Sequence, residues 1–264
     1  DIFIVTYKKD YPYLRWCLKS ISKFARGFNH LHILVPVGAA DELHAMPELQ
    51  DVKSHSMPVS IHQGEEWPGK GFLWHMFNIM YADNWCVGAE FVAHIDPDCI
   101  FTEPVTPDDY IHDGKPYLRY ERYESLGRRH PGAAQWQEPT QRSLPFPVWA
   151  ECMRCHPGVF HIGLYPKTRE LVEQATRIPF EDYVKQQRNE FPQTLSEFNT
   201  LGSVALDCFR DKYIPVEQKT DRVTPYNKLQ QFWSHGRIDL PQRIWVGGVE
   251  MDVVPLNMCF EILG

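Results

Sequence analysis

The chain opens with short apolar runs that alternate with amphipathic segments. Runs rich in β-branched and aromatic residues predict strands over 2–5, 31–37, 52–55 and 91–95. Apolar residues at helical spacing predict helices over 13–24, 40–46 and 72–81. Strands that alternate with helices indicate a parallel sheet with right-handed crossovers.

The pattern becomes less regular after residue 104. It predicts strands over 117–120 and 159–162, a helix over 167–175 and another helix that begins at Ser196. Short strands and turns are expected from Tyr213 onward. The polar, proline-containing segment 127–147 is expected to be a long loop, and loops of that length are usually functional or mobile.

These elements predict an α/β fold with a mostly parallel, Rossmann-like central sheet flanked by helices and an irregular second half. A length of 264 residues suits one large domain, here 1–264, made of a first half over 1–104 and a second half over 105–264. A hydrophobic content of 43% excludes a disordered chain.

Charge and cysteine content narrow the possible partners and location. A formal net charge of −7, with Lys and Arg scattered, argues against a nucleic-acid partner. No apolar run reaches the roughly 20 residues that span a bilayer. The chain starts at Asp1 with no signal sequence, so we expect it to be trimmed or cut from a longer polypeptide. Seven cysteines, an odd number, indicate buried thiols in a reducing, cytoplasmic setting.

One acidic pair stands directly after a predicted buried strand. Residues 91–95 are followed by Asp96-Pro97-Asp98, in which both carboxylates can face one point because residues i and i+2 of an extended segment share a side. Such oxygen ligands suit Mg²⁺ or Mn²⁺, which also binds water and substrate phosphates. A solvated turn that begins at Pro97 is the alternative.

Several segments resemble a known enzyme group. Ile4-Val5-Thr6-Tyr7, followed by a helix with Leu18-Lys19-Ser20-Ile21, looks like the start of GT-A glycosyltransferases, and Asp96-Pro97-Asp98 sits where those enzymes carry an Asp-x-Asp motif. Further segments are similar to ones in a set of largely uncharacterised microbial glycosyltransferases: Cys152-Met153-Arg154, Pro157-Gly158-Val159-Phe160, Ser196 to Gly202, and Phe232-Trp233-Ser234.

The resemblance implies transfer of a sugar from a nucleoside diphosphate sugar, which we expect to be a UDP-sugar, to a hydroxyl of a carbohydrate acceptor. The half over 1–104 would bind the donor and the half over 105–264 the acceptor. By the same resemblance Asp98 bonds Mn²⁺ or Mg²⁺, Asp96 contacts the metal or the ribose, and His235 completes the metal site. A histidine in a turn is the alternative for His235.

Other donor contacts are expected near the first strand and the helix over 72–81. In the resembled fold Thr6 and Tyr7 would cradle the base and ribose, although they could simply end the strand. Lys70, Trp74 and Asn78 share one helix face at i, i+4 and i+8, with Lys70 near phosphate. Core packing is the alternative for Trp74.

Glu197 is the predicted general base. It follows Ser196, a suitable N-cap, and the helix dipole favours a charged carboxylate in the first turn. A capping role is the alternative. A base at Glu197 predicts direct displacement with inversion at the anomeric carbon.

The second half holds candidates for acceptor binding. Arg154 and His156 are expected to contact the acceptor or a phosphate. Aromatic residues near the predicted loop could stack on sugar rings or pack in the core: Tyr117, Tyr120, Tyr123 and Trp136. The run from Cys152 to His156 also matches a haem-attachment pattern. A zinc site made of Cys152, Cys155, His156 and His161 is a further alternative.

Two other function classes remain open at this point. A nucleotidyltransferase on a related sheet would share the metal pair, although no glycine-rich phosphate loop follows the first strand, where Thr6-Tyr7-Lys8-Lys9 stands. A non-catalytic carbohydrate-binding domain would keep the fold without turnover.

Overall fold

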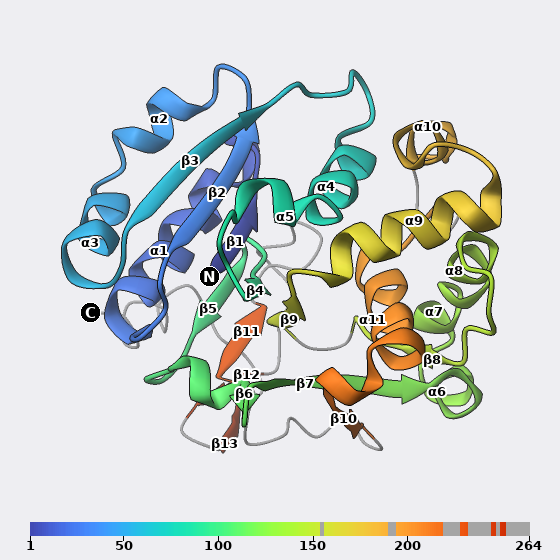
Figure 1. The fold of residues 1–264 in the computed structure, drawn as a ribbon. Coiled ribbons are helices and arrows are strands. Elements are labelled where there is room, and N and C mark those ends of the chain that lie inside the picture. The colour runs from blue at the N-terminus through green and yellow to red at the C-terminus, as the bar shows by residue number, and fades with distance from the viewer. Residues whose placement is uncertain (154–155, 190–193, 219–227, 232–243, 247–248, 252–264) are drawn as a thin grey trace. The chain divides into compact units, whose positions relative to one another are not determined.

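The computed structural model describes residues 1–264 except 154–155, 190–193, 219–227, 232–243, 247–248 and 252–264 (Figure 1). The chain divides into two compact units that interleave along the sequence. Unit 1 comprises 1–65, 94–110 and 222–264, and unit 2 comprises 66–93 and 111–221.

The main sheet contains five strands in the order β3-β2-β1-β4-β9. Their bounds are β1 Ile2–Val5, β2 Leu31–Pro36, β3 Val59–Gly64, β4 Phe91–His94 and β9 Gly158–His161. Strand β2 runs parallel to both β1 and β3, with Leu31 opposite Ile2 and Val59. The structure thus has the α/β architecture that the sequence predicts, with a mainly parallel central sheet flanked by helices.

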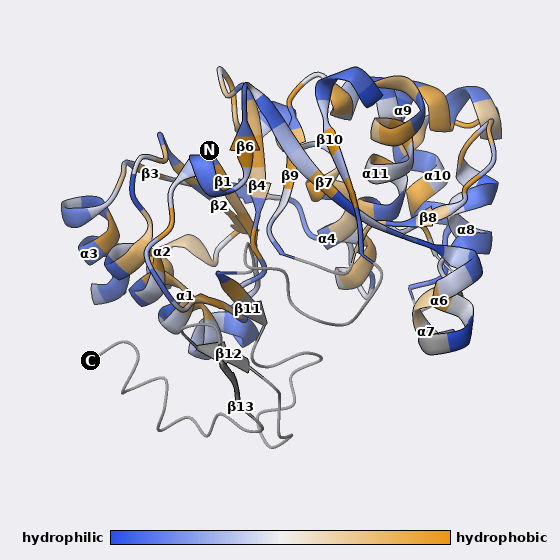
Figure 2. Ribbon diagram, turned by 90° about the horizontal axis from the view of Figure 1, so that it is seen from below, coloured by the Kyte–Doolittle hydropathy of each residue, from blue (hydrophilic) through white to orange (hydrophobic). Residues whose placement is uncertain are grey.

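In unit 1 an amphipathic helix covers the strands. Helix α1 (Tyr11–Phe24) buries Leu14, Cys17, Leu18 and Ile21, and it packs beside α3 (Pro47–His55), whereas α2 (Ala40–His44) contacts β3. Figure 2 shows the hydrophobic character of β1 and β2. Every residue of β1, from Ile2 to Val5, is buried.

Short elements complete unit 1. They are the 3-10 helices η1 (Lys8–Asp10) and η2 (Pro107–Asp109), and the strands β5 (Cys99–Phe101), β11 (Leu229–Gln231), β12 (Ile244–Val246) and β13 (Val249–Met251). Strand β5 pairs antiparallel with β11, and the Phe101 amide donates to Ser20 Oγ of α1 at 3.0 Å. That bond anchors β5 on the helix.

Unit 2 is mostly helical. Its helices are α4 (Gly71–Ile79), α5 (Ala82–Trp85), α6 (Tyr123–Arg129), α7 (Pro131–Ala134), α8 (Gln137–Ser143), α9 (Leu164–Thr176), α10 (Phe180–Gln186) and α11 (Glu197–Cys208), followed by the 3-10 helix η3 (Arg210–Lys212). Strand β7 (Lys115–Arg122) pairs with β6 (Ile111–His112), β8 (Ala150–Glu151) and β10 (Ile214–Glu217). Helix α11 is buried on all sides from Glu197 to Leu206, and contacts α9 and β8.

The predicted strand over 52–55 is wrong, because these residues end helix α3. Pro47 stands in its first turn, where a missing amide hydrogen costs nothing, and Leu49 and Val52 are buried at helical spacing. The third strand of the sheet is instead β3, which begins four residues after α3 ends.

The predicted loop over 127–147 is also wrong, because it contains the end of α6 and all of α7 and α8. Pro131 and Pro139 lie in the first turns of α7 and α8, a position that tolerates proline. Trp136 and Thr140, one helical turn apart, are both buried. The prolines therefore mark helix starts.

The other elements predicted before Tyr213 are confirmed, with ends shifted by a few residues. Of the short strands expected from Tyr213 onward, β10, β11, β12 and β13 are present, and much of the remaining segment lies outside the described residues. Of the described cysteines, Cys17, Cys86 and Cys99 are buried free thiols, as expected, whereas Cys152 is half-buried and Cys208 is exposed. None of the helices in the described part of the chain has both the length and the apolar character needed to cross a membrane.

Candidate functional site

The acidic pair Asp96 and Asp98 lies in a turn at the carboxyl end of β4. The Ile95 amide donates to the Phe3 carbonyl of β1 at 3.2 Å, and the Cys99 amide donates to the Asp96 carbonyl at 3.0 Å, which closes the turn. Both aspartates are half-buried and Pro97 between them is buried. The pair therefore faces a partly enclosed environment.

Both carboxylates act electrostatically on two buried thiols. Burial raises the pKa of the Cys17 and Cys99 thiols well above the usual value, and the negative charges of Asp98 and Asp96 raise both further. Cys17 belongs to α1 and Cys99 to β5, so the charges of this turn are felt in the core beneath it.

The pair stands at a topological switch point of the sheet. The strand order places β2 on one side of β1 and β4 on the other. In open α/β sheets, ligands bind outside the carboxyl ends of the strands at such a point. Because β1 and β4 advance side by side from the Ile95–Phe3 bond, Asp96 comes level with the end of β1, where Thr6 follows.

Thr6 and Tyr7 form the β1 side of this candidate site. The Thr6 amide continues the ladder by donating to the Leu34 carbonyl at 3.0 Å. Its side chain is fully buried, and among the described residues no group hydrogen-bonds its Oγ1. Tyr7 is half-buried, with the Lys9 ammonium 5.4 Å from its ring centroid.

The acidic pair fits a hard divalent cation by its chemistry. Two carboxylates supply oxygen ligands, and Mg²⁺ usually takes only one or two carboxylates together with water and phosphate oxygens. In the described part of the chain, no three His, Cys, Asp or Glu side chains come together to hold a metal ion. His235, the third predicted ligand, lies outside the described residues.

Lys70, Trp74 and Asn78 belong to unit 2, where Lys70 is the N-cap of α4. The Lys70 ammonium donates to the Lys185 carbonyl. Trp74 is 1% exposed, and the Asn78 amide donates to the Trp74 carbonyl at 2.8 Å. Trp74 is thus a core residue, and the Asn78 side-chain amide donates within its own helix. A donor-binding role for the three stays a prediction.

Glu197 is the first residue of α11, as the sequence predicts. Ser196 caps the helix, because its Oγ accepts a hydrogen bond from the Asn199 amide at 3.3 Å. Glu197 is only 4% exposed, so its carboxylate is held inside unit 2. The N-terminal end of the helix dipole favours its negative charge.

The predicted acceptor residues are only partly visible. Arg154 lies outside the described residues. His156 is half-buried and meets the Phe198 ring edge-on at 5.9 Å between centroids. Tyr120, Tyr123 and Trp136 are each less than 10% exposed, which agrees with the core-packing alternative.

The metal alternatives around Cys152 gain no support from the described residues. Cys155 lies outside them, and His161 Nδ1 accepts a hydrogen bond from the Gly163 amide at 3.0 Å. Cys152 packs against α11, where Asn199 Oδ1 accepts a hydrogen bond from its amide at 2.7 Å. This cysteine therefore has a packing role.

Unit 2 also contains buried carboxylates that sequence reasoning missed. Glu121 and Glu151 face each other across β7 and β8 and are 1% and 2% exposed. Burial raises the pKa of Tyr123, and the charge of Glu151 raises it further. The sequence held little signal for them, because β7 (Lys115–Arg122) also carries Lys115, Arg119 and Arg122, and β8 has only two residues.

No protein-family model matches the chain, and no curated protein matches it. Among solved structures, the chain is similar to the apo crystal structure of mouse xyloside xylosyltransferase 1 at 11% sequence identity and a TM-score of 0.43. The match covers 81% of this chain and 84% of that chain. At this level the likeness carries no argument about activity or site residues.

Proposed function

We propose that this chain is a metal-dependent glycosyltransferase that moves a sugar from a nucleoside diphosphate sugar, a UDP-sugar, to a hydroxyl of a carbohydrate acceptor. The observation that carries the proposal is the position of Asp96 and Asp98 at the switch point beside the carboxyl end of β1. Open α/β sheets bind nucleotides at this place, and a diphosphate needs compensating positive charge there.

Asp96 and Asp98 are the residues that would hold Mn²⁺ or Mg²⁺. The bound ion would stabilise the negative charge that develops on the departing diphosphate. The aspartates fix the position of that positive charge, because a turn closed by the Cys99–Asp96 bond carries both. Their half-buried setting also strengthens the interaction relative to open water.

The end of β1 would hold the nucleoside. Thr6 offers a buried hydroxyl with no hydrogen-bond partner among the described residues, and Tyr7 offers a partly exposed ring. A hydroxyl beside an aromatic face suits a ribose and its base. Lys70, Trp74 and Asn78 of α4 are proposed as further donor contacts, with Lys70 near phosphate.

Glu197 is proposed as the general base that accepts the proton of the acceptor hydroxyl, and Arg154 and His156 as acceptor contacts. Glu197 lies in the first turn of α11, where the helix dipole favours a charged carboxylate, the form that a base requires. A base that activates the acceptor for direct displacement gives a product of inverted anomeric configuration.

The test is a panel of nucleotide sugars with Mn²⁺, Mg²⁺ or EDTA. We expect slow donor hydrolysis and a rise in melting temperature with one sugar and metal, both lost in EDTA. Asp98→Ala should lower the hydrolysis rate about 100-fold or more, because it removes a charge-stabilising contact. Asp98→Asn keeps the side-chain volume and should show the same loss, and NMR of the transfer product should show inversion.

Asp51→Ala is the matched control, because Asp51 is an exposed aspartate on α3 outside the candidate site. It should keep full hydrolysis and metal dependence. The proposal is wrong if no nucleotide sugar stabilises the protein with any metal. Release of inorganic pyrophosphate in place of a nucleoside diphosphate would identify a nucleotidyltransferase, and retained configuration would remove Glu197 as the base.

A further inference from the structure

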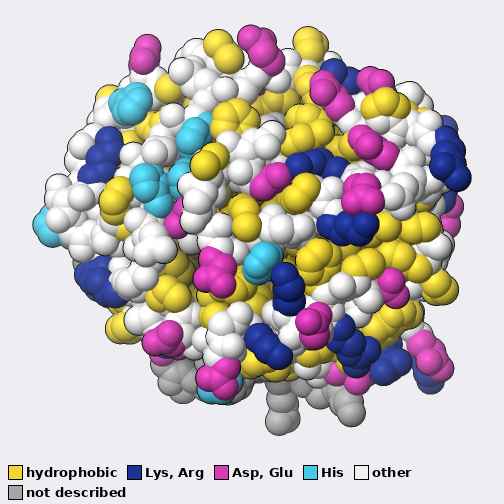
Figure 3. All heavy atoms as spheres, in the orientation of Figure 1, with side chains coloured by type: hydrophobic (Ala, Val, Ile, Leu, Met, Phe, Trp, Pro, Cys, Tyr) yellow, Lys and Arg dark blue, Asp and Glu magenta, His cyan; other side chains and the backbone are white. Residues whose placement is uncertain are grey.

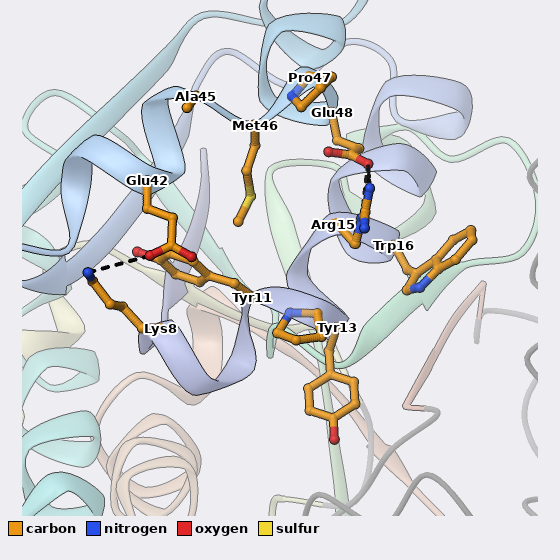
Figure 4. Close-up of a pocket in the computed structure, with 11 residues that line it drawn as sticks. Lys8, Tyr11, Tyr13, Arg15, Trp16, Glu42, Ala45, Met46, Pro47 and Glu48 are labelled. Atoms are coloured by element: carbon orange, nitrogen blue, oxygen red, sulfur yellow. Dashed lines mark hydrogen bonds and ion pairs between the residues drawn. The ribbon is translucent and has the colours of Figure 1, made fainter.

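Unit 1 contains a hollow that the proposed donor site does not use. It has a volume of about 600 Å³, within the usual range for small-molecule sites. Its wall comes from η1 and the start of α1 on one side and from α2 and the start of α3 on the other (Figure 4). Thr6, Asp96 and Asp98 are not among its lining residues.

Two ion pairs face each other across the hollow. Lys8 Nζ lies 3.4 Å from Glu42 Oε2, and Arg15 Nη2 lies 2.9 Å from Glu48 Oε1. Each positive charge is therefore balanced by a carboxylate, so a phosphate or nucleotide would have to displace an internal partner. The charge balance favours an uncharged ligand.

Glu48 is the most constrained of these groups, since its side chain is only 6% exposed. Arg15 Nε and Nη2 both donate to the same oxygen, Oε1, at 3.1 and 2.9 Å. Figure 4 shows the other oxygen pointing toward Met46, on the side away from Arg15. A buried carboxylate thus keeps one acceptor atom directed into the hollow.

The surface between the ion pairs is apolar. Met46 lies between Glu42 and Glu48 in Figure 4, where the Tyr11 ring overlaps the Glu42 carboxylate, and Pro12 and Pro47 extend this surface. The Tyr11 hydroxyl donates to the Ala39 carbonyl at 2.8 Å, which holds the ring in place. Burial and the nearby Glu42 raise the pKa of Tyr11 to about 12, so the phenol stays neutral.

We propose that this hollow, the Tyr11–Glu48 pocket, binds a neutral saccharide at a site separate from the donor. A sugar hydroxyl both donates and accepts, so it can engage both members of an ion pair, while the C–H face of the sugar ring packs on Met46 and Pro47 beside the buried Tyr11 ring. The choice of a saccharide rests on the proposed function. A glycan acceptor has more than one sugar unit, so one unit can occupy this pocket while another reacts at the donor site.

The test is saturation-transfer NMR of the full chain with neutral sugars, without donor or metal. Glucose, galactose, xylose, N-acetylglucosamine, cellobiose and lactose are the probes. At least one should bind saturably. Glu48→Gln should weaken that binding about tenfold, because it removes a charged acceptor. Ala45→Trp should abolish binding, because Ala45 is exposed and lines the pocket, so a large side chain there fills it.

Glu170→Gln is the matched control, since Glu170 forms a surface ion pair with Lys167 in unit 2 and should leave binding unchanged. Absence of binding by every sugar overturns the proposal, as does binding that neither Glu48→Gln nor Ala45→Trp alters. Binding of a proline decapeptide in the pocket, with no sugar bound, would also overturn it.

The proposed function and the saccharide site can fail separately. Asp98→Ala should lose donor hydrolysis and retain saccharide binding. Sugar binding without any donor hydrolysis in the unsubstituted protein would contradict the transferase and leave the pocket in place. Donor hydrolysis without sugar binding would contradict the saccharide site and leave the transferase in place.

Discussion

Gly202 lies in the middle of α11, where the helix approaches the segment after β8. A Cβ atom built on Gly202 would come within 2.5 Å of Cys152 Sγ, far closer than normal van der Waals contact. The same segment is tied to the helix by the Cys152–Asn199 hydrogen bond at 2.7 Å. The absence of a side chain at residue 202 therefore permits this contact between helix and strand.

Gly202→Ala should destabilise the protein by about 1–3 kcal/mol, because the added methyl overpacks a buried contact. The measurement is the urea midpoint followed by circular dichroism. Gly132→Ala is the control, since Gly132 lies in α7 with open space around its Cβ position. It should be neutral or slightly stabilising. Equal midpoints for the two variants would contradict the packing argument.

Helices α5 and α9 are joined by one arginine. Arg169 Nη1 and Nη2 donate to the two carboxylate oxygens of Asp83 at 2.6 and 2.8 Å, and Nη1 also donates to the Met80 carbonyl at 2.6 Å. The guanidinium lies 4.2 Å from the Tyr81 ring centroid. The Arg169 and Asp83 side chains are only 14% and 17% exposed, so water screens this contact weakly.

Arg169→Ala should cost about 2–4 kcal/mol, because it leaves a partly buried carboxylate and a carbonyl without their donor. Lys167→Ala, two residues earlier on α9, removes an exposed pair with Glu170 at 3.0 Å and should cost less than about 1 kcal/mol. Thermal unfolding of both variants is the measurement. A similar loss for both would show that burial does not set the strength of these pairs.

At the scale of the whole molecule, Figure 3 shows acidic and basic side chains interspersed over the face viewed. Unit 1 also carries a histidine group on β2 and β3. His32 Nδ1 lies 3.0 Å from His62 Nε2, and His32 Nε2 lies 3.1 Å from Asp1 Oδ2.

The stability of the molecule should depend on the protonation of these histidines. Burial is the main cause that lowers the pKa of His32 to about 4. Burial and the neighbouring rings lower the pKa of His30 and His62. The unfolded chain, with histidine pKa near about 6.5, binds more protons below that pH than the folded chain does. The stabilisation is therefore present above about pH 6.5 and is lost as the pH falls toward 4.

The expected loss from His32 is at most about 3 kcal/mol over that range. Urea denaturation between pH 7 and pH 4 measures it, and His32→Gln should flatten the dependence. His55→Gln, a substitution of an exposed histidine on α3, should leave the curve unchanged. Parallel curves for His32→Gln and the unsubstituted chain would contradict the prediction.

Local patterns determined much of this protein. Apolar runs and helical spacing predicted β1, β2, β4, α1, α4 and α11, because hydrophobic burial acts through the periods of strand and helix. The same reasoning placed Asp96 and Asp98 directly after a strand and Glu197 in a first helical turn. Each of these predictions needs only residues that are neighbours in sequence.

Only the tertiary structure decided which distant residues meet. Pro131 and Pro139 indicated a loop, but burial of Trp136 and Thr140 favours helix there. The β-branched Val52 indicated a strand, but its burial at helical spacing favours helix. Three features depend on how distant segments cross: the position of β4 beside β1, the effect of Asp96 and Asp98 on Cys17 and Cys99, and the Arg15–Glu48 pair. Their energies come from contacts between residues far apart in sequence, which no local pattern records.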